Sequence, residues 1–144
     1  MDVQTLAGTC DTVAGILKPK ALLRELDIEF ARSRRYENSF ALLRVKITIS
    51  DHTQTDSALL QRLSGAVRLV VRWSDSVAKE SACQYLILLR ETNASGARTA
   101  ADKLVAVIHT ELPEDTQKLN FEFNFAAWRK GDHLQALLAR LGGS

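Results

Sequence analysis

The segment "VRWSDSVAKESACQYLILLRET", from Val71 to Thr92, predicts a β-hairpin, and the rest of the chain is arranged around it. Two runs rich in strand-forming residues, 76–80 and 83–90, are separated by the small residues Ser81 and Ala82. This pattern is typical of two antiparallel strands joined by a tight turn. The segment therefore predicts neighbouring strands in a sheet, with a turn that carries few chemical groups.

Segments with the apolar spacing of a helix and segments with the alternation of a strand lie on either side of the hairpin. Apolar residues at helical spacing predict helices, and alternating apolar residues predict strands. The expected helices are 18–35, 56–71, 92–109 and 131–141, and the expected strands are 39–49 and 119–128. Pro19 suits a helix first turn, and the expected caps of the later helices are Asp56, Asn93 or Ser95, and Asp132. The order predicts an α/β (α+β) fold with one mixed sheet and helices packed on it.

Composition restricts the class of protein. A chain of 144 residues with 46% hydrophobic content is expected to form a single domain over residues 1–144. A net charge of only +2 argues against nucleic acid as a partner. No apolar run is long enough to span a membrane, so direct membrane insertion is not expected. Cys10 and Cys83 lack disulfide or zinc spacing, which favours the cytoplasm.

The landmarks, taken in order, resemble those of the GGDEF domain, the bacterial domain that makes cyclic di-GMP. "DTVAGILKPKAL" resembles the family's opening D-x-L-T-G-L-x-N-R and keeps Asp11 and Gly15, with Pro19 where an Arg usually stands. "RWSDSVAKESACQYLILL" resembles the stretch R-x-x-D-x-v-a-R-x-G-G-D-E-F-x-i-L-L. Weaker matches follow the same order: "SFALLRVKIT" for the first strand, "DHTQTD" for G-H-x-x-G-D, "FEFNFAAW" for a later strand and "HLQALLARL" for the last helix.

This resemblance implies a GGDEF-like, nucleotidyl cyclase-like fold. Such a fold has a central mixed, mostly antiparallel sheet of about five strands flanked by helices. Residues 1–10 then form an N-terminal extension.

The sequence departs from the family where the cyclase chemistry resides. Lys46 and Thr48 stand where acids that bind magnesium are expected, and an ammonium group repels a cation. At the signature turn, Ser81 and Ala82 replace the two glycines, and Cys83 and Gln84 replace the two acids. The family's F-K-x-x-N-D piece is also missing after the first strand. We therefore expect a degenerate GGDEF domain that is not an enzyme, with no catalytic residue, no metal site and no magnesium cofactor.

Arg72 and Asp75 keep the spacing of the R-x-x-D motif, at which many family members bind cyclic di-GMP. A guanidinium fork can donate to guanine O6 and N7, and a carboxylate can accept from N1 and N2. Lys103 falls where a further basic residue helps in the family, and Trp73 offers a ring for stacking. The resemblance thus implies a cyclic di-GMP receptor whose pocket a second chain, a neighbouring domain or a partner protein completes.

Three alternatives remain open. Arg72 and Asp75 could form only an exposed ion pair, with Trp73 as plain packing. The domain would then be a ligand-free scaffold for dimerisation or docking in a bacterial signalling or secretion complex. Binding of GTP without turnover is the third reading.

Other chemical groups are weaker candidates. The three histidines, His52, His109 and His133, are scattered without metal spacing. Cys83 lacks a recognisable base nearby, so a plain turn residue is favoured over a nucleophile. The basic run before Tyr36 is better explained as a solvated helix end than as a phosphate site; it consists of Arg32, Arg34 and Arg35.

Overall fold

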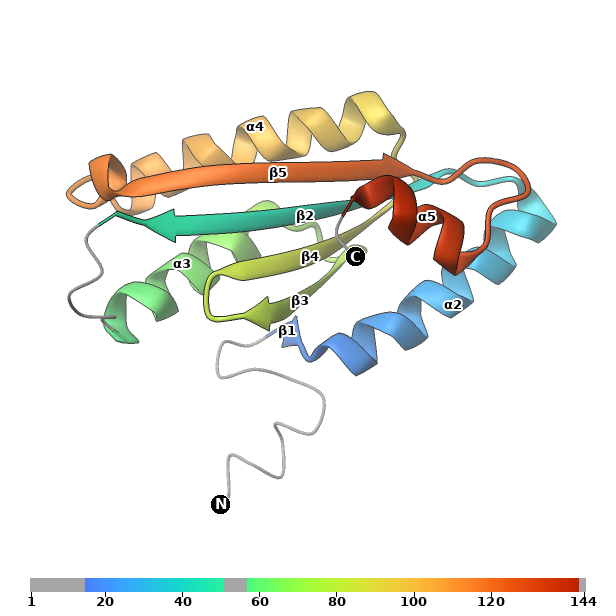
Figure 1. Cartoon of the computed structure of the whole chain (residues 1–144), viewed down its shortest axis with the longest axis horizontal. Helices are drawn as coiled ribbons and strands as arrows, with labels where there is room; N and C mark the ends of the chain where they lie inside the picture. The colour runs from blue at the N-terminus through green and yellow to red at the C-terminus, as the bar shows by residue number, and fades with distance from the viewer. Residues whose placement is uncertain (1–14, 51–56, 143–144) are drawn as a thin grey trace, which may run out of the picture.

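A five-stranded sheet forms the centre of the molecule, with helices on both of its faces (Figure 1). The structure is a computed structural model and describes residues 15–50 and 57–142. The strands are β1 (Ile16–Leu17), β2 (Phe40–Ile49), β3 (Ser76–Ser81), β4 (Gln84–Arg90) and β5 (Leu119–Ala127). The helices are α2 (Pro19–Tyr36), α3 (Ser57–Val70), α4 (Ala94–Glu111) and α5 (Leu134–Leu141), with a short 3₁₀ helix, η1 (Thr116–Lys118), before β5.

The strands lie in the order β1-β3-β4-β2-β5. Only β1 and β3 run parallel, and every other neighbouring pair is antiparallel. This arrangement confirms the expected mixed, mostly antiparallel sheet of about five strands. The β3–β4 hairpin lies between β1 and β2 in the sheet.

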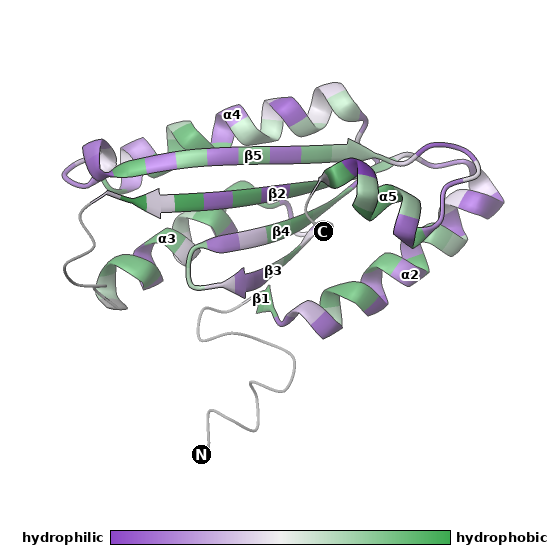
Figure 2. Cartoon of the chain, viewed as in Figure 1, coloured by the Kyte–Doolittle hydropathy of each residue, from purple (hydrophilic) through white to green (hydrophobic). Residues whose placement is uncertain are grey.

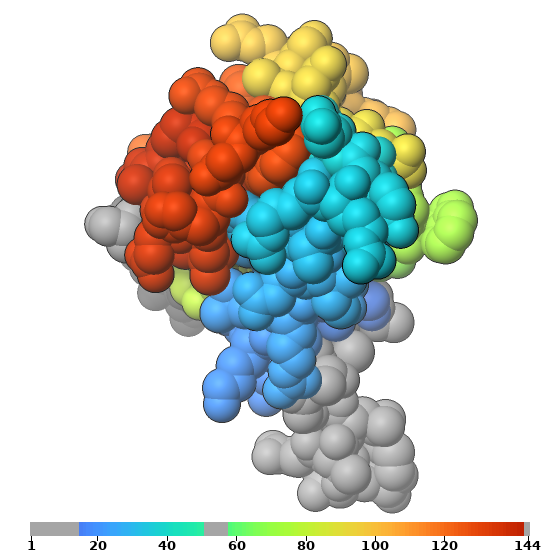
Figure 3. Space-filling view, turned by 90° about the vertical axis from the view of Figure 1, so that its right-hand side faces the viewer, coloured from blue at the N-terminus to red at the C-terminus, as the bar shows by residue number. Residues whose placement is uncertain are grey.

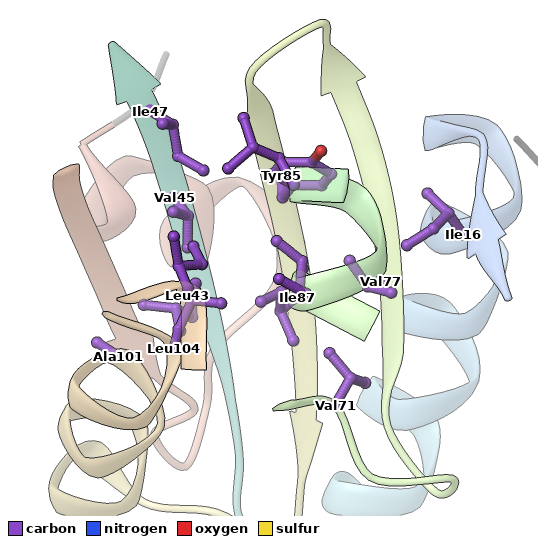
Figure 4. Close-up of a cluster of buried hydrophobic side chains, with 14 of the residues drawn as sticks. Ile16, Leu43, Val45, Ile47, Val71, Val77, Tyr85, Ile87, Ala101 and Leu104 are labelled. Atoms are coloured by element: carbon purple, nitrogen blue, oxygen red, sulfur yellow. The ribbon is translucent and has the colours of Figure 1, made fainter. Parts of the chain in front are cut away.

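Each sheet face is covered by a different pair of helices. α3 and α4 cover one face through the larger apolar cluster, which includes Leu63 from α3 and Leu104 from α4. Figure 4 shows Leu104 together with Leu43 and Val45 of β2. α2 and α5 cover part of the other face through a smaller cluster, which includes Leu26 and Leu137. The inner strands β2 and β4 both contribute to both clusters, because alternate residues of each strand point to opposite faces of the sheet.

Alternation along β2 follows the prediction. Leu43, Val45 and Ile47 point into the cluster beneath α3 and α4, while Leu42 points into the other cluster. Towards the end of the strand this second face becomes polar and exposed. In Figure 2 the start of β2 is green, and purple bands alternate with green ones further along the strand. The α2 and α5 layer therefore covers only half of its sheet face.

The boundaries of the hairpin and of the last helix differ from expectation. Ser81 belongs to β3, and the turn is formed by Ala82 and Cys83, because a bulge between Lys79 and Ser81 shifts the register. The prediction that Asp132 caps α5 was wrong. His133 is the cap, and its Nδ1 accepts a hydrogen bond from the Ala136 amide.

Two further caps can be compared with expectation. The Asn93 side chain caps α4 by accepting a bond from the Gly96 amide, as predicted. The expected cap Asp56 lies outside the described residues. Gly15, which the family resemblance singled out, has φ of +88°, and an added Cβ would collide with the Arg68 side chain. Within the described residues, no helix is both long and apolar enough to cross a bilayer.

Candidate functional site

Arg72 and Asp75 form the turn that leads from α3 into β3. The Asp75 amide donates to the Arg72 carbonyl at 2.9 Å, which closes the turn. The register of the hairpin places Ser76, the first residue of β3, opposite Leu88 near the end of β4. The pair therefore lies at the base of the hairpin, at the opposite end from the Ala82–Cys83 turn.

The Asp75 carboxylate is buried, with 1% of its side chain exposed, and both of its oxygens accept hydrogen bonds. Arg72 Nε donates to Oδ2 at 2.8 Å, and Arg72 Nη2 donates to Oδ1 at 3.1 Å. The backbone amides of Arg90 and Arg72 add bonds of 3.0 and 3.3 Å. Asp75 therefore fixes the Arg72 guanidinium and links the α3–β3 turn to the end of β4.

Arg72 bridges the α3–β3 turn to the end of β4. Its Nη2 donates to the Arg90 carbonyl at 2.7 Å and to Thr92 Oγ1 at 3.0 Å. The bond to Asp75 is the main cause that raises the pKa of the Arg72 guanidinium above its usual value. The side chain is nevertheless 54% exposed, and Nη1 donates no bond to any described residue. Nη1 is thus the nitrogen that faces a ligand or solvent.

A pocket of about 380 Å³ opens beside this pair. Arg72, Asp75 and Lys103 all line it, together with Glu91 and Thr92 from the β4–α4 connection. Figure 3 faces this end of the molecule, where the start of α4 in yellow lies beside the α3–β3 segment in light green. The fold therefore brings three of the four predicted ligand-binding residues to one cavity.

Trp73 is the residue that the fold keeps apart from the pocket. Its side chain is 91% exposed, and it is not among the residues that line the cavity.

The positions that the family resemblance aligns with metal and phosphate binding gather at the other end of the hairpin. Lys46 pairs with Gln84 across β2 and β4, and both Lys46 and Thr48 lie exposed on the open half of the sheet face. The Cys83 carbonyl accepts a bond from the Ile47 amide at 2.8 Å. Burial raises the pKa of the Cys83 thiol, which favours its neutral form.

An ion pair occupies the sheet face beside these positions. Arg44 holds Glu80 through two bonds, of 2.9 Å from Nε and 3.0 Å from Nη2. Gln84 Nε2 adds a third bond to Glu80 at 3.0 Å. Although burial opposes ionisation, these bonds keep the pKa of Glu80 below its usual range. The acid nearest the turn on this face is therefore already engaged by protein donors.

Within residues 15–50 and 57–142, no three His, Cys, Asp or Glu side chains form a cluster suited to a metal ion. His109 packs beside Phe121 on α4 and β5, and His133 caps α5. His52 lies outside the described residues. At the end of α2, Arg32 pairs with Glu29 at 3.5 Å. Arg35 stacks over the Tyr36 ring with 5.9 Å between Cζ and the ring centroid.

The sequence did not predict the network of ion pairs and hydrogen bonds that Arg90 makes next to Arg72 and Asp75. Arg90 donates to Glu29 at 3.0 Å, to Glu25 at 2.7 Å and to the Ser74 carbonyl at 2.6 Å. This network ties α2 to the hairpin base. Glu91, at the pocket rim, has a left-handed backbone with φ of +49°. The available signal was Glu29, an acid at helical spacing among the apolar residues Leu26 and Phe30 of α2, because a buried acid requires a cation.

Comparison with known proteins identifies the fold. No protein-family model matches the sequence, and no curated protein matches it. Solved structures do match. The GGDEF domain of DgcB from Caulobacter crescentus in complex with c-di-GMP superposes with a TM-score of 0.78 at 16% identity, covering 99% of this chain and 87% of that chain.

Two other solved structures agree with it. The GGDEF domain of FimX from Pseudomonas aeruginosa has a TM-score of 0.77 at 16% identity, covering 93% of this chain and 89% of that one. The diguanylate cyclase SiaD from the same organism, in complex with its activator SiaC, has a TM-score of 0.79 at 19% identity, covering 96% and 57%. Similarity of this kind, at such low identity, establishes the architecture. The chain has a GGDEF-like fold.

Proposed function

We propose that this domain is a catalytically inactive, cyclic di-GMP-responsive receptor module of the bacterial cytoplasm. One observation carries the proposal: Arg72 and Lys103, which are far apart in the sequence, line one open pocket at the base of the hairpin. Arg72 and Lys103 offer cationic donors to a phosphate in this pocket of about 380 Å³, whose lining also includes Asp75, which is paired with Arg72, and Glu91. The c-di-GMP complex of the similar DgcB domain supports this choice of ligand.

In this proposal Arg72 contacts the ligand and Asp75 positions Arg72. The fork of Nε and Nη2, which we expected to face guanine, already engages the Asp75 carboxylate. Nη1 remains for a guanine acceptor or a phosphate oxygen. Because both Asp75 oxygens accept bonds from the protein, a direct bond from Asp75 to guanine would require the turn to open.

The pocket is at the small end of the range for ligand sites, so it can accept a base and part of the sugar-phosphate ring. The remainder of a cyclic dinucleotide would extend over the rim. A second ligand, a second chain or a neighbouring domain would then complete the site. Trp73, which is exposed close by in sequence, is available to such a partner and not to a base inside the pocket.

Absence of cyclase activity is the second part of the proposal. Magnesium-assisted phosphoryl transfer needs carboxylate ligands on the metal. Here Lys46 and Gln84 face each other across β2 and β4, and Glu80 is held by Arg44. Incubation of the protein with GTP and magnesium or manganese is expected to give no cyclic di-GMP. Enzyme-dependent product would refute this part.

Binding is tested by calorimetry with cyclic di-GMP on the whole chain. Wild type is expected to bind, and Arg72→Lys is expected to weaken binding by about 10- to 100-fold, the effect of losing one charge-assisted hydrogen bond. Lysine keeps a positive charge beside the buried Asp75, so the variant should remain folded. Lys103→Ala should also weaken binding.

Arg98→Ala is the matched control, because Arg98 is an exposed arginine of α4 that does not line the pocket. Its affinity should equal that of wild type. If wild type gives no heat of binding at ligand concentrations in the hundreds of micromolar, the receptor proposal fails. An equal loss in Arg98→Ala and Arg72→Lys would contradict the assigned site.

The hydrogen bonds that already occupy the Asp75 carboxylate favour a second candidate function. A buried carboxylate with four protein donors is also what a purely structural clamp requires. In that case the domain is a ligand-free scaffold for dimerisation or docking. Silence in the calorimetric experiment together with a folded wild type would favour this candidate.

A further inference from the structure

β5 is a long edge strand whose one charged side chain is that of Glu122. It spans Leu119–Ala127, and β2 is its only neighbour among the strands of the described chain (Figure 1). Natural edge strands are usually blunted by proline, lysine or a bulge. The strand contains none of these: its sequence is LNFEFNFAA, and its register with β2 is unbroken from one end to the other.

The backbone groups at the free edge can be identified from the hydrogen bonds at both ends of the strand. The Trp128 amide donates to the Phe40 carbonyl, and the Lys118 carbonyl accepts from Ser50, so even-numbered residues bond to β2. In an antiparallel ladder the alternate residues direct their N–H and C=O groups the other way. The outward-facing residues are Leu119, Phe121, Phe123, Phe125 and Ala127.

We propose that two copies of this chain associate by antiparallel pairing of their β5 strands about a twofold axis at Phe123. Phe123 is the midpoint of Leu119–Ala127, so this register pairs the whole length of both strands. It matches outward N–H groups of one copy with outward C=O groups of the other. The two sheets then continue as one.

The side chains on the polar face of β5 favour the register with its axis at Phe123 over the adjacent registers, with axes at Glu122 or Phe121. With the axis at Phe123, Glu122 lies opposite Asn124 of the second copy, so a carboxylate meets an amide. With the axis at Glu122, the two Glu122 side chains would face each other, which is unfavourable. With the axis at Phe121, the strand end at Ala127 would lose its partner.

The aromatic face supports the same pairing. Phe121, Phe123 and Phe125 are only partly buried against the cluster beneath α4. Within one chain, Phe121 and Phe123 already stack with 6.1 Å between ring centroids. In the proposed register each Phe121 lies opposite Phe125 of the second copy and the two Phe123 residues face each other, which removes further aromatic surface from water.

Sedimentation equilibrium of the whole chain, with variants at Asn124, tests the proposal. Wild type is expected to show a concentration-dependent monomer–dimer equilibrium. Asn124→Glu places like charges opposite each other twice per dimer, and Asn124→Lys places opposite charges there. At cross-strand energies of about 0.2–1 kcal/mol per pair, the dimer Kd should change by roughly 2- to 30-fold, upwards for Glu and downwards for Lys.

If the substitutions at Asn124 acted only on the stability of the monomer, the effects of glutamate and lysine would be reversed. Asn124 lies opposite Arg44 within the monomer, so glutamate is the more favourable neighbour there and lysine the less favourable. Asn120→Glu is the register control: Asn120 would face Ala126 of the second copy, and its substitution should leave the Kd unchanged. A loss of dimer with Asn120→Glu and none with Asn124→Glu would overturn the register.

Amide hydrogen exchange by NMR gives a second readout. The outward amides of Phe121, Phe123 and Phe125 should gain protection as protein concentration rises, while the amides of α2 should not. A wild type that is monomeric at millimolar concentration would overturn the proposal. So would a dimer in which these three amides stay unprotected. Neither result bears on ligand binding at Arg72, so the two proposals fail separately.

Discussion

Replacement of Arg90 by methionine is expected to destabilise the fold more than any exposed ion-pair deletion. Arg90 is 17% exposed and pairs with Glu29, whose side chain is 2% exposed. It also bonds Glu25 and the Ser74 carbonyl. Methionine fills a similar volume but removes the cation. The Glu29 carboxylate would then remain buried without its main partner.

The magnitude follows from that geometry. Breaking a buried pair by removing one partner costs about 3–5 kcal/mol. Arg32 remains 3.5 Å from Glu29 and is 48% exposed, so it compensates weakly, and the lower end of the range applies. We expect a loss of about 3 kcal/mol in the free energy of unfolding, which corresponds to a fall in Tm of roughly 10 °C for a domain of this size.

Urea denaturation followed by circular dichroism measures the loss. The double variant Glu29→Leu/Arg90→Met should recover most of it, since the uncompensated carboxylate is gone. Lys130→Ala is the control, because Lys130 pairs with Glu37 at 3.8 Å on the surface, and its loss should be under about 0.5 kcal/mol. A double variant as unstable as Arg90→Met would refute the reasoning and assign the loss to the other bonds of Arg90, with Ser74, Ser76 and Glu25.

Two further outcomes are expected. The hydrogen bond from Arg140 is the main cause that holds the pKa of Asp132 below its usual range. The stability that this carboxylate contributes is therefore complete above its unfolded pKa of about 3.9 and is lost as pH falls through the lower folded value. Asp132→Asn should flatten the decline of unfolding free energy below about pH 4 in urea titrations, and an unchanged slope would contradict the assignment. Leu104→Ala, at a fully buried position, should cost about 2–5 kcal/mol by the same assay, whereas Leu69→Ala, at 64% exposure, should cost far less. Equal losses at the two leucines would contradict the assignment of the core.

Much of the fold was predictable because its signals are local. The alternation in β2 and the helical spacing in α2 each appear in a single run of residues, and their order predicted the sheet. β1 was missed because two residues, Ile16 and Leu17, are too few to show a period. The cap of α5 was predicted one residue early, because Asp132 and His133 are adjacent and both can accept a bond.

The candidate site was predictable in position but not in detail. The spacing of Arg72 and Asp75 placed them at the hairpin base, where the structure has them. Sequence cannot show how a guanidinium divides its donors, so the engagement of Nε and Nη2 by Asp75 was not foreseen. The absence of Trp73 from the pocket was missed for a similar reason, because the direction of a side chain in a turn depends on the backbone there.

The two tryptophans of the chain lie in contrasting surroundings, which gives the protein a built-in optical probe. Trp73 is 91% exposed beside Arg72, while Trp128 stacks on Phe40 with its Nε1 buried. Soluble quenchers such as acrylamide will reach Trp73 far more readily than Trp128. Emission at long wavelength therefore reports events at the hairpin base, and emission at shorter wavelength reports the packing of α2 and α5 on the sheet.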